Sequence, residues 1–230
     1  MIRSANIATM PSRLGHLEKV LQSIHKQFDI IRIYGNKFLA PPIELIQKYP
    51  NVHWIHDGAD LTDNGKFYGL DILTKPEYYF TLDDDIIYPP DYADVMVDNI
   101  GKYHAIVTIH GRILMGENLN YYKGHEFHHC TAENPDAFYL DVCGTGVTAF
   151  DTRYFKPEHL DQSEYKRMSD VVFSHAAAMQ GRHIVCIEKP ANWVKPLPVN
   201  DSIYSSEKNT KQEFQIKLCN EIWQRKRSTE

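Results

Sequence analysis

An apolar run of strand length that stops at three consecutive carboxylates constrains this chain more than any other feature. Residues 78–82 read YYFTL, and Asp83, Asp84 and Asp85 follow directly. An unbroken apolar run of this length is typical of a strand buried on both faces of a parallel sheet. Ligands bind outside the carboxyl ends of the strands in open parallel sheets. The sequence therefore predicts a central strand that delivers three carboxylates to a ligand-binding edge.

Strand and helix patterns alternate along most of the remaining sequence. The apolar positions of residues 14–24 recur at helical spacing, directly after a short strand pattern over residues 6–9. Further strand patterns occupy residues 30–34, 52–55, 105–109, 138–142, 147–150 and 183–188. Helix patterns occupy residues 91–103 and 169–180, and a turn is expected over residues 86–90. Alternation of this kind predicts an α/β fold: a Rossmann-like, mainly parallel central sheet flanked by helices.

Length and charge limit the class of protein. The chain has 230 residues and a net charge of −5, which predicts no general attraction to nucleic acid. It contains no apolar stretch of the roughly 20 residues that a membrane span requires. The N-terminus lacks the pattern of a signal peptide, so we expect a cytoplasmic protein. The four cysteines show no C-x-x-C spacing, and reduced thiols are expected.

The composition changes near the C-terminus. We expect residues 1–200 to form the sheet domain and residues 201–230 to form a polar extension with an amphipathic helix over residues 211–227. Basic residues lie close to the apolar side of this helix. The helix can pack on the domain, which we favour, or make a peripheral contact with an anionic membrane surface.

The three carboxylates predict a metal site. Adjacent like charges raise one another's pKa, and a bound cation relieves the cost. Carboxylate oxygens favour hard cations, so Mn²⁺ or Mg²⁺ held for a diphosphate is the preferred interpretation. The alternative is a solvated acidic turn that caps the next helix. We prefer the metal, because such a turn would not need a strongly apolar strand in front of it.

Five segments carry a resemblance to a known family. They are IATMPSR (7–13), NGKFYGL (64–70), YYFTLDDDIIYPPDY (78–92), CGTG (143–146) and MSDVVFSHAA (168–177). In this order they resemble the GT-A fold glycosyltransferases, in particular the family 2-like group, over about residues 3–200. The resemblance implies a nucleotide-sugar donor, with UDP favoured, a divalent metal, and inverting transfer to a glycan or lipid-linked acceptor.

The resemblance also assigns roles to the residues of the carboxylate segment. Asp85 is expected to contact the metal. Asp83 is expected beside it, at the metal and at the ribose or sugar of the donor. Asp84 either assists the donor contact or shapes the turn.

Two further segments are expected to line the nucleotide. Thr9, Pro11 and Arg13 lie on the first strand-to-helix loop, although Arg13 alone could equally be a surface cation at a helix start. Asn36 follows the second strand, where relatives often carry an acidic residue that reads the base. An asparagine at this position could still hydrogen-bond uracil.

The remaining donor contacts lie in two loops. Asp63 is expected to hold a sugar hydroxyl, and Lys66 to balance phosphate charge. Gly144 and Thr145 belong to a glycine loop that permits close backbone approach to a ligand, or that is an ordinary turn.

Asp170 is the predicted catalytic residue. The matching family position holds the general base, which removes a proton from the acceptor hydroxyl. The alternative is an aspartate favoured at a helix start by the helix dipole.

Two other functions remain open from the sequence. The first is a sugar-phosphate nucleotidyltransferase, which would be expected to carry a glycine-rich, basic loop near its N-terminus. Residues 7–15, IATMPSRLG, match such a loop poorly. The second is a non-catalytic carbohydrate-binding domain. The sequence favours a metal-dependent glycosyltransferase over both.

Overall fold

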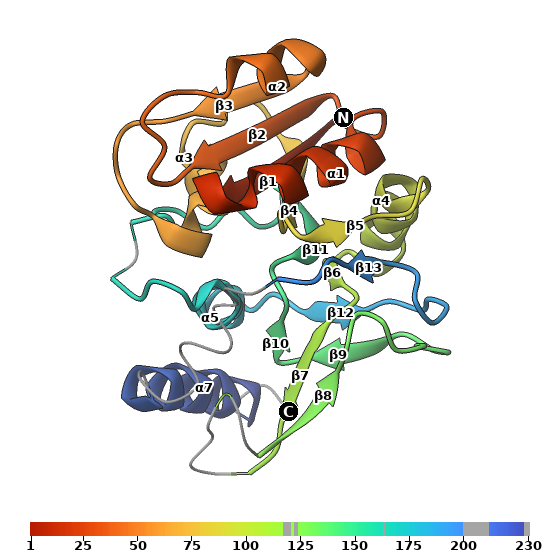
Figure 1. The fold of residues 1–230 in the computed structure, drawn as a ribbon. Helices are drawn as coiled ribbons and strands as arrows, with labels where there is room; N and C mark the ends of the chain where they lie inside the picture. The colour runs from red at the N-terminus through yellow and green to blue at the C-terminus, as the bar shows by residue number, and fades with distance from the viewer. Residues whose placement is uncertain (117–120, 122–123, 163, 200–211, 228–230) are drawn as a thin grey trace.

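A central eight-stranded sheet organises the molecule (Figure 1). The computed structural model describes residues 1–116, 121, 124–162, 164–199 and 212–227. In spatial order the strands are β3 (Val52–Ile55), β2 (Ile30–Gly35), β1 (Ile2–Thr9), β4 (Glu77–Leu82), β11 (Val147–Asp151), β6 (Ile106–Thr108), β12 (Ile184–Cys186) and β9 (Phe138–Leu140). Six strands run in one direction, and β11 and β9 run opposite to them. The predicted α/β fold with a mainly parallel sheet is confirmed.

Helices cover both faces of this sheet, and each face has its own apolar core. One core joins the sheet to α1 (Leu14–Ile24), α2 (Ile43–Lys48) and α4 (Tyr92–Tyr103). The other joins it to the 3₁₀ helix η2 (Thr62–Phe67), α3 (Tyr68–Asp71), α5 (Ser169–Met179) and α7 (Gln212–Arg227). Neighbouring strand residues divide between the two cores: Tyr79 belongs to the second and Phe80 to the first. This alternation is the reason that the strand sequences are apolar throughout.

Two small sheets extend the fold. A three-stranded antiparallel sheet consists of β10 (Val142–Cys143), β7 (Gly111–Leu114) and β8 (His125–His128). The single strand expected over residues 138–142 is therefore wrong, because the chain changes sheets at Asp141. The Asp141 amide donates to the Arg112 carbonyl at 3.0 Å, and its carboxylate accepts from the Leu114 amide at 2.8 Å.

The second small sheet pairs β5 (Ile86–Ile87) with β13 (Lys195–Pro196). The sequence predicts a turn over residues 86–90, but its first two residues form β5. A partner strand more than 100 residues away in sequence makes the difference, and no local pattern reveals it.

The last described helix lies against the domain. In Figure 1, α7 (blue) runs beside α5 (cyan). Leu218, Cys219 and Ile222 are buried in the second core, and His175 of α5 lies 2.6 Å from a carboxylate oxygen of Glu221. Residues 200–211, which precede α7, lie outside the described residues. Within the described part of the chain, no helix is both long enough and apolar enough to cross a membrane.

The topology brings several loops to one edge of the central sheet. Strands β1, β2, β4 and β6 all end at this edge, because they run parallel. Strand β11 begins there, because it is antiparallel to β4 and β6. The residues that follow β1 and β4 therefore meet those that precede β11.

Candidate active site

Three carboxylates stand at the end of β4, as the sequence predicts. Asp84 is buried, with 8% of its surface exposed. The side chain of Asp85 is 23% exposed and that of Asp83 is 40% exposed. The outer two aspartates can therefore reach a ligand, whereas Asp84 is held inside the fold.

The loop after β1 supplies a cation to these carboxylates. Pro11 opens the short 3₁₀ helix η1 (Pro11–Arg13), whose last residue is buried at 7% exposure. The Nη1 atom of Arg13 lies 2.7 Å from Oδ2 of Asp85 and 3.5 Å from Oδ1 of Asp84. Thr9 donates a 2.6 Å hydrogen bond to the other oxygen of Asp84. Arg13 is thus part of the carboxylate cluster and is not a surface cation.

A second cation comes from the 3₁₀ helix η2. Lys66 is only 4% exposed, and its Nζ lies 2.5 Å from Oδ1 of Asp83. Burial alone would lower the pKa of this ammonium group, but the charges of Asp83, Asp63 and Asp170 outweigh burial and raise it. Lys66 therefore stays charged at the carboxylate edge.

The buried environment changes the proton affinity of the inner carboxylates. Burial raises the pKa of Asp84 to about 7; the charge of Asp85 adds to this effect, and the Thr9 hydrogen bond and Arg13 oppose it. Burial and the charge of Asp83 also raise the pKa of Asp85, against the influence of Arg13. The three carboxylates carry more negative charge than Arg13 and Lys66 balance. A bound cation would reduce the repulsion between them.

The glycine loop before β11 packs directly on this cluster. A Cβ atom on Gly146 would overlap the carboxylate of Asp83, and a Cβ on Gly144 would overlap the ring of His110. The hydroxyl of Tyr88 accepts from the Asp83 amide at 2.9 Å and donates to the Gly146 carbonyl at 2.6 Å. Both glycines are therefore required by close approach, which an ordinary turn would not demand.

Asp170 adjoins the same loop at the start of α5. Its Oδ1 accepts from the amide and from the hydroxyl of Thr145, both at 2.8 Å. Its Oδ2 accepts from the hydroxyl of Tyr121 at 2.8 Å, and that hydroxyl in turn accepts from Nη1 of Arg112 at 2.8 Å. Burial by itself would raise the pKa of Asp170, but the Thr145 hydrogen bonds and the charges of Arg112 and His110 lower it. These hydrogen bonds hold Asp170 as a weakly basic carboxylate.

Two predicted donor contacts are occupied by the backbone. The Asn36 amide group donates to the Thr62 carbonyl at 2.8 Å and accepts from the Leu61 amide at 2.9 Å. The carboxylate of Asp63 accepts from the amides of Arg167 and Ser169 at 2.7 and 2.9 Å. Asn36 therefore fixes the loop before η2, and Asp63 caps the start of α5.

The structure thus brings together most of the residues that the sequence singles out. They are Thr9, Arg13, Lys66, Asp83, Asp84, Asp85, Gly144, Thr145 and Asp170. The sequence interpretation missed His110, Arg112 and Tyr121. His110 follows the strand expected over residues 105–109, so the same strand-end argument that selects Asp83 could have found it.

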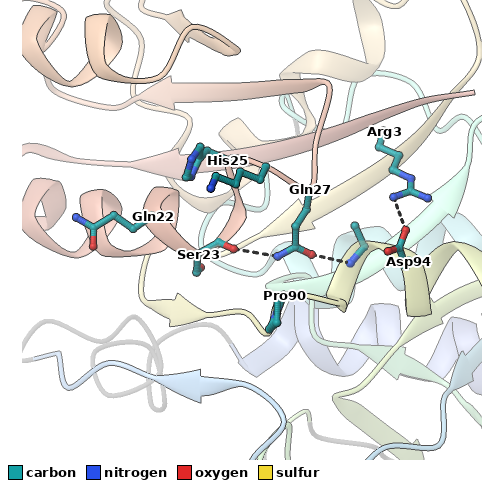
Figure 2. Close-up of a pocket in the computed structure, with 9 residues that line it drawn as sticks. Arg3, Gln22, Ser23, His25, Gln27, Pro90 and Asp94 are labelled. Atoms are coloured by element: carbon teal, nitrogen blue, oxygen red, sulfur yellow. Dashed lines mark hydrogen bonds and ion pairs between the residues drawn. The ribbon is translucent and has the colours of Figure 1, made fainter.

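A cavity of about 340 Å³ lies elsewhere (Figure 2). It is lined by the start of β1 with Arg3, the end of α1 and the start of α4, at the opposite end of β1 from Thr9. Gln27 donates to the carbonyls of Ser23 and Pro89 at 2.9 Å and accepts from the Ala93 amide at 3.0 Å, and Arg3 pairs with Asp94 at 2.6 Å. The Gln27 contacts join the end of α1 to the start of α4, and the Arg3–Asp94 pair joins β1 to α4.

Comparison with known proteins identifies a fold. No family model matches the chain. No curated protein matches it either. Among solved structures, the chain is similar to 4-diphosphocytidyl-2C-methyl-D-erythritol synthase from Anaerococcus prevotii DSM 20548, with a TM-score of 0.48 and 16% identity over 97% of this chain and 98% of that one. A second structure of 4-diphosphocytidyl-2C-methyl-D-erythritol synthase has a TM-score of 0.50 and 9% identity, and the match covers 90% of this chain and 98% of that one.

These likenesses correct the functional expectation drawn from the sequence. The similar structure with a TM-score of 0.50 is named as a synthase of a diphosphocytidyl compound and not as a glycosyltransferase. The expected transfer of a sugar from a nucleotide-sugar donor to a glycan or lipid-linked acceptor is therefore wrong. At such low identity the likeness shows a shared fold. The chain has a mixed α/β, Rossmann-like fold of the nucleotide-binding type, with a mostly parallel central sheet flanked by helices.

Proposed function

We propose that this chain is a metal-dependent nucleotidyltransferase that joins a nucleoside monophosphate, taken from a nucleoside triphosphate, to a sugar phosphate or polyol phosphate. The observation that carries the proposal is the pairing of two buried cations, Arg13 and Lys66, with three consecutive carboxylates at the end of the central strand β4. The names of the similar structures, which describe a diphosphocytidyl product, support the same reaction class.

The positions of the two cations explain why the N-terminal loop lacks a glycine-rich, basic pattern. Arg13 comes from the loop after β1, and Lys66 comes from η2, more than 50 residues later. Both side chains are buried and held by carboxylates, so they are oriented before a ligand arrives. Two fixed cations at one sheet edge suit a polyphosphate, because charge-assisted hydrogen bonds to phosphate oxygens are strong.

The outer carboxylates fit a hard divalent cation. Mg²⁺ is usually bound through one or two carboxylates together with substrate phosphates and water. Asp83 and Asp85 offer two partly exposed carboxylates, and among the described residues no larger group of His, Cys, Asp or Glu could hold a metal. Asp83 and Asp85 would hold Mg²⁺ or Mn²⁺, which when bound supplies Lewis-acid stabilisation of the phosphates.

The transfer itself needs little covalent chemistry from the protein. An oxygen of the acceptor phosphate forms a bond to the α-phosphorus of the triphosphate. The bond from this phosphorus to the oxygen that bridges to the β-phosphate breaks, and its electron pair leaves with pyrophosphate. Arg13 and Lys66 stabilise the negative charge that develops on the leaving group. The weakly basic Asp170 is no obstacle, because a phosphate oxygen attacks without prior loss of a proton.

Release of pyrophosphate tests the proposal. The protein is incubated with each of the four ribonucleoside triphosphates, Mg²⁺ or Mn²⁺, and a panel of sugar and polyol phosphates. We expect pyrophosphate release that depends on both the metal and the acceptor, and a new diphosphate resonance in ³¹P NMR. Absence of pyrophosphate from every triphosphate, together with breakdown of nucleoside diphosphate sugars, would contradict the proposal.

A further inference from the structure

His110 occupies the part of the sheet edge next to the carboxylate cluster. It lies between β6 and β7, and its ring packs against Gly144. Gly144 belongs to the loop Gly144–Thr145–Gly146. In this loop Gly146 contacts the carboxylate of Asp83, and Thr145 donates to the carboxylate of Asp170. One short loop, Gly144 to Gly146, therefore contacts His110, Asp83 and Asp170.

The His110 ring is fixed in orientation. The Cys130 amide donates to its Nδ1 atom at 3.1 Å. The rings of Phe127 and His129 meet it edge to face, with centroid distances of 5.1 and 5.5 Å. The hydrogen bond at Nδ1 and the two aromatic contacts fix the ring. A ring flip that exchanged Nδ1 and Nε2 would break these contacts.

The backbone contact also determines which nitrogen carries the proton. Because Nδ1 accepts from an N–H group, the neutral ring must carry its proton on Nε2. Burial lowers the pKa of His110 to about 4, although the charges of Asp170 and Asp83 oppose this effect. The ring is thus neutral at physiological pH, with Nε2–H as its free donor.

The Nε2 edge of the ring is available to a ligand. Across the part of the chain that the structure describes, no side chain or backbone group accepts a hydrogen bond from Nε2, and His110 is partly exposed. Asp170 and Asp83 are close enough to influence its charge. From the residues that the structure describes, Asp170 Oδ2 receives one hydrogen bond, donated by Tyr121, and a carboxylate oxygen can accept two.

We propose that His110 and Asp170 form an acceptor subsite that recognises a hydroxyl group of the phosphate-bearing substrate. The hydroxyl accepts from Nε2–H of His110 and donates to Oδ2 of Asp170. A neutral donor beside an ionised acceptor complements a hydroxyl, which both accepts and donates, better than it complements a second phosphate. This inference rests on the proposed nucleotidyl transfer, and it assigns a polyhydroxylated acceptor to that reaction.

A pair of probes that differ by their hydroxyl groups tests the subsite. Glycerol 3-phosphate and propyl phosphate are titrated separately into the Mg²⁺-loaded protein and followed by ¹⁵N NMR of the histidine rings. We expect glycerol 3-phosphate to bind about tenfold more tightly, the value of a net hydrogen bond or two, and to shift the Nε2 resonance of His110. Equal affinities, including no binding of either probe, would overturn the proposal.

Two substitutions separate the hydrogen bond from the packing of the ring. His110→Phe keeps the ring shape but removes the donor, and we expect it to abolish the preference for glycerol 3-phosphate. His110→Gln retains an N–H donor at a similar reach and should restore part of the preference. The exposed His53 offers the matched control, since His53→Phe should leave the preference unchanged. A preference that survives in His110→Phe would show that another group reads the hydroxyl.

The binding experiment is independent of turnover. If no triphosphate yields pyrophosphate, the proposed function fails while the NMR titration still decides the role of His110. If pyrophosphate is released but the two probes bind equally, the proposed function stands and the subsite fails.

Discussion

The ammonium group of Lys66 lies 2.5 Å from Oδ1 of Asp83, and the lysine is buried whereas the aspartate is half exposed. Lys66→Met would remove the cation without leaving a buried charge behind, because Asp83 keeps its access to water. We expect unfolding free energy to change by only about 1 kcal/mol. Triphosphate affinity should fall about tenfold or more, since a charge-assisted contact is lost.

Calorimetry with a nucleoside triphosphate measures this affinity. Lys37→Met is the matched control, because Lys37 is exposed and pairs with Asp60 at 3.1 Å on the surface. Unchanged triphosphate binding in Lys66→Met would exclude the lysine from the phosphate site.

The outer carboxylates should control metal binding. Asp83→Asn and Asp85→Asn each remove one charged oxygen donor and are expected to lower metal-dependent activity on the order of 100-fold. Electron paramagnetic resonance of Mn²⁺ in the presence of a triphosphate reports the bound metal directly. Asp94→Asn serves as the control, because the Asp94 side chain is 69% exposed and pairs with Arg3 away from this edge. Full Mn²⁺ binding in both variants of the cluster would place the metal elsewhere.

A single methyl group at Gly146 should disturb the cluster. Gly146→Ala would push its Cβ into the Asp83 carboxylate, and such overpacking costs about 1–3 kcal/mol. We expect a folded protein with weakened metal binding, measured by thermal unfolding with and without Mn²⁺. Gly101→Ala is the control without a clash. Gly101 lies on α4, and a Cβ added there meets no atom within 4 Å. It should stabilise the protein by about 0.5–1 kcal/mol. Wild-type metal binding in Gly146→Ala would refute the close approach.

Asp63 should contribute to stability through α5. Its carboxylate receives the Ser169 amide at 2.9 Å, so it caps the first turn of this helix from a distant segment. Asp63→Ala should lower the unfolding free energy by about 1–2 kcal/mol in urea titration, and Asp63→Asn by less, because the amide oxygen can still accept. Asp98→Ala, at an exposed position of α4, should stay within about 0.5 kcal/mol of wild type. If Asp63→Ala had the same unfolding free energy as wild type, Asp63 would not cap α5.

His110 should make stability fall in mild acid. Its pKa in the folded protein, about 4, lies below the ordinary value of 6.5. The folded state therefore binds fewer protons than the unfolded state between these values. The contribution is fully present above pH 6.5 and is lost as the pH falls toward 4, by on the order of 2 kcal/mol.

Urea titrations between pH 7 and pH 4.5 in metal-free buffer measure this loss. His110→Gln should lose less stability than wild type over the interval. The raised pKa of Asp84 has the opposite slope, and it cancels in the comparison because both proteins contain Asp84. Parallel pH profiles for the two proteins would show that His110 is not buried as a neutral ring.

The elements with strong local patterns could be predicted from the sequence. The helix over residues 14–24 and the strand over residues 52–55 have the same bounds in the structure, because each has one clear apolar period. Strand β5 and the change of sheet at Asp141 could not be predicted, since distant partners create them.

The same distinction applies to the site. The strand-end argument places Asp83 at the carboxyl edge of the sheet, where the structure has it. No sequence pattern reveals that the side chains of Asn36 and Asp63 bind backbone groups about 25 and 105 residues away. The strand-end argument applies equally to His110, which follows the strand expected over residues 105–109, but a single histidine suggests no particular chemistry. The Cys130 amide that orients the ring comes from a segment 20 residues away, which the sequence does not reveal.

The contact between α7 and α5 has a practical consequence for producing fragments of this protein. Leu218 and Ile222 cover apolar surface of the helix that begins beside Asp170. A fragment that stops near Pro198 would leave this surface in water, and exposed apolar patches promote self-association. We expect such a fragment to aggregate during expression, and a separately supplied peptide of residues 212–227 to restore its solubility.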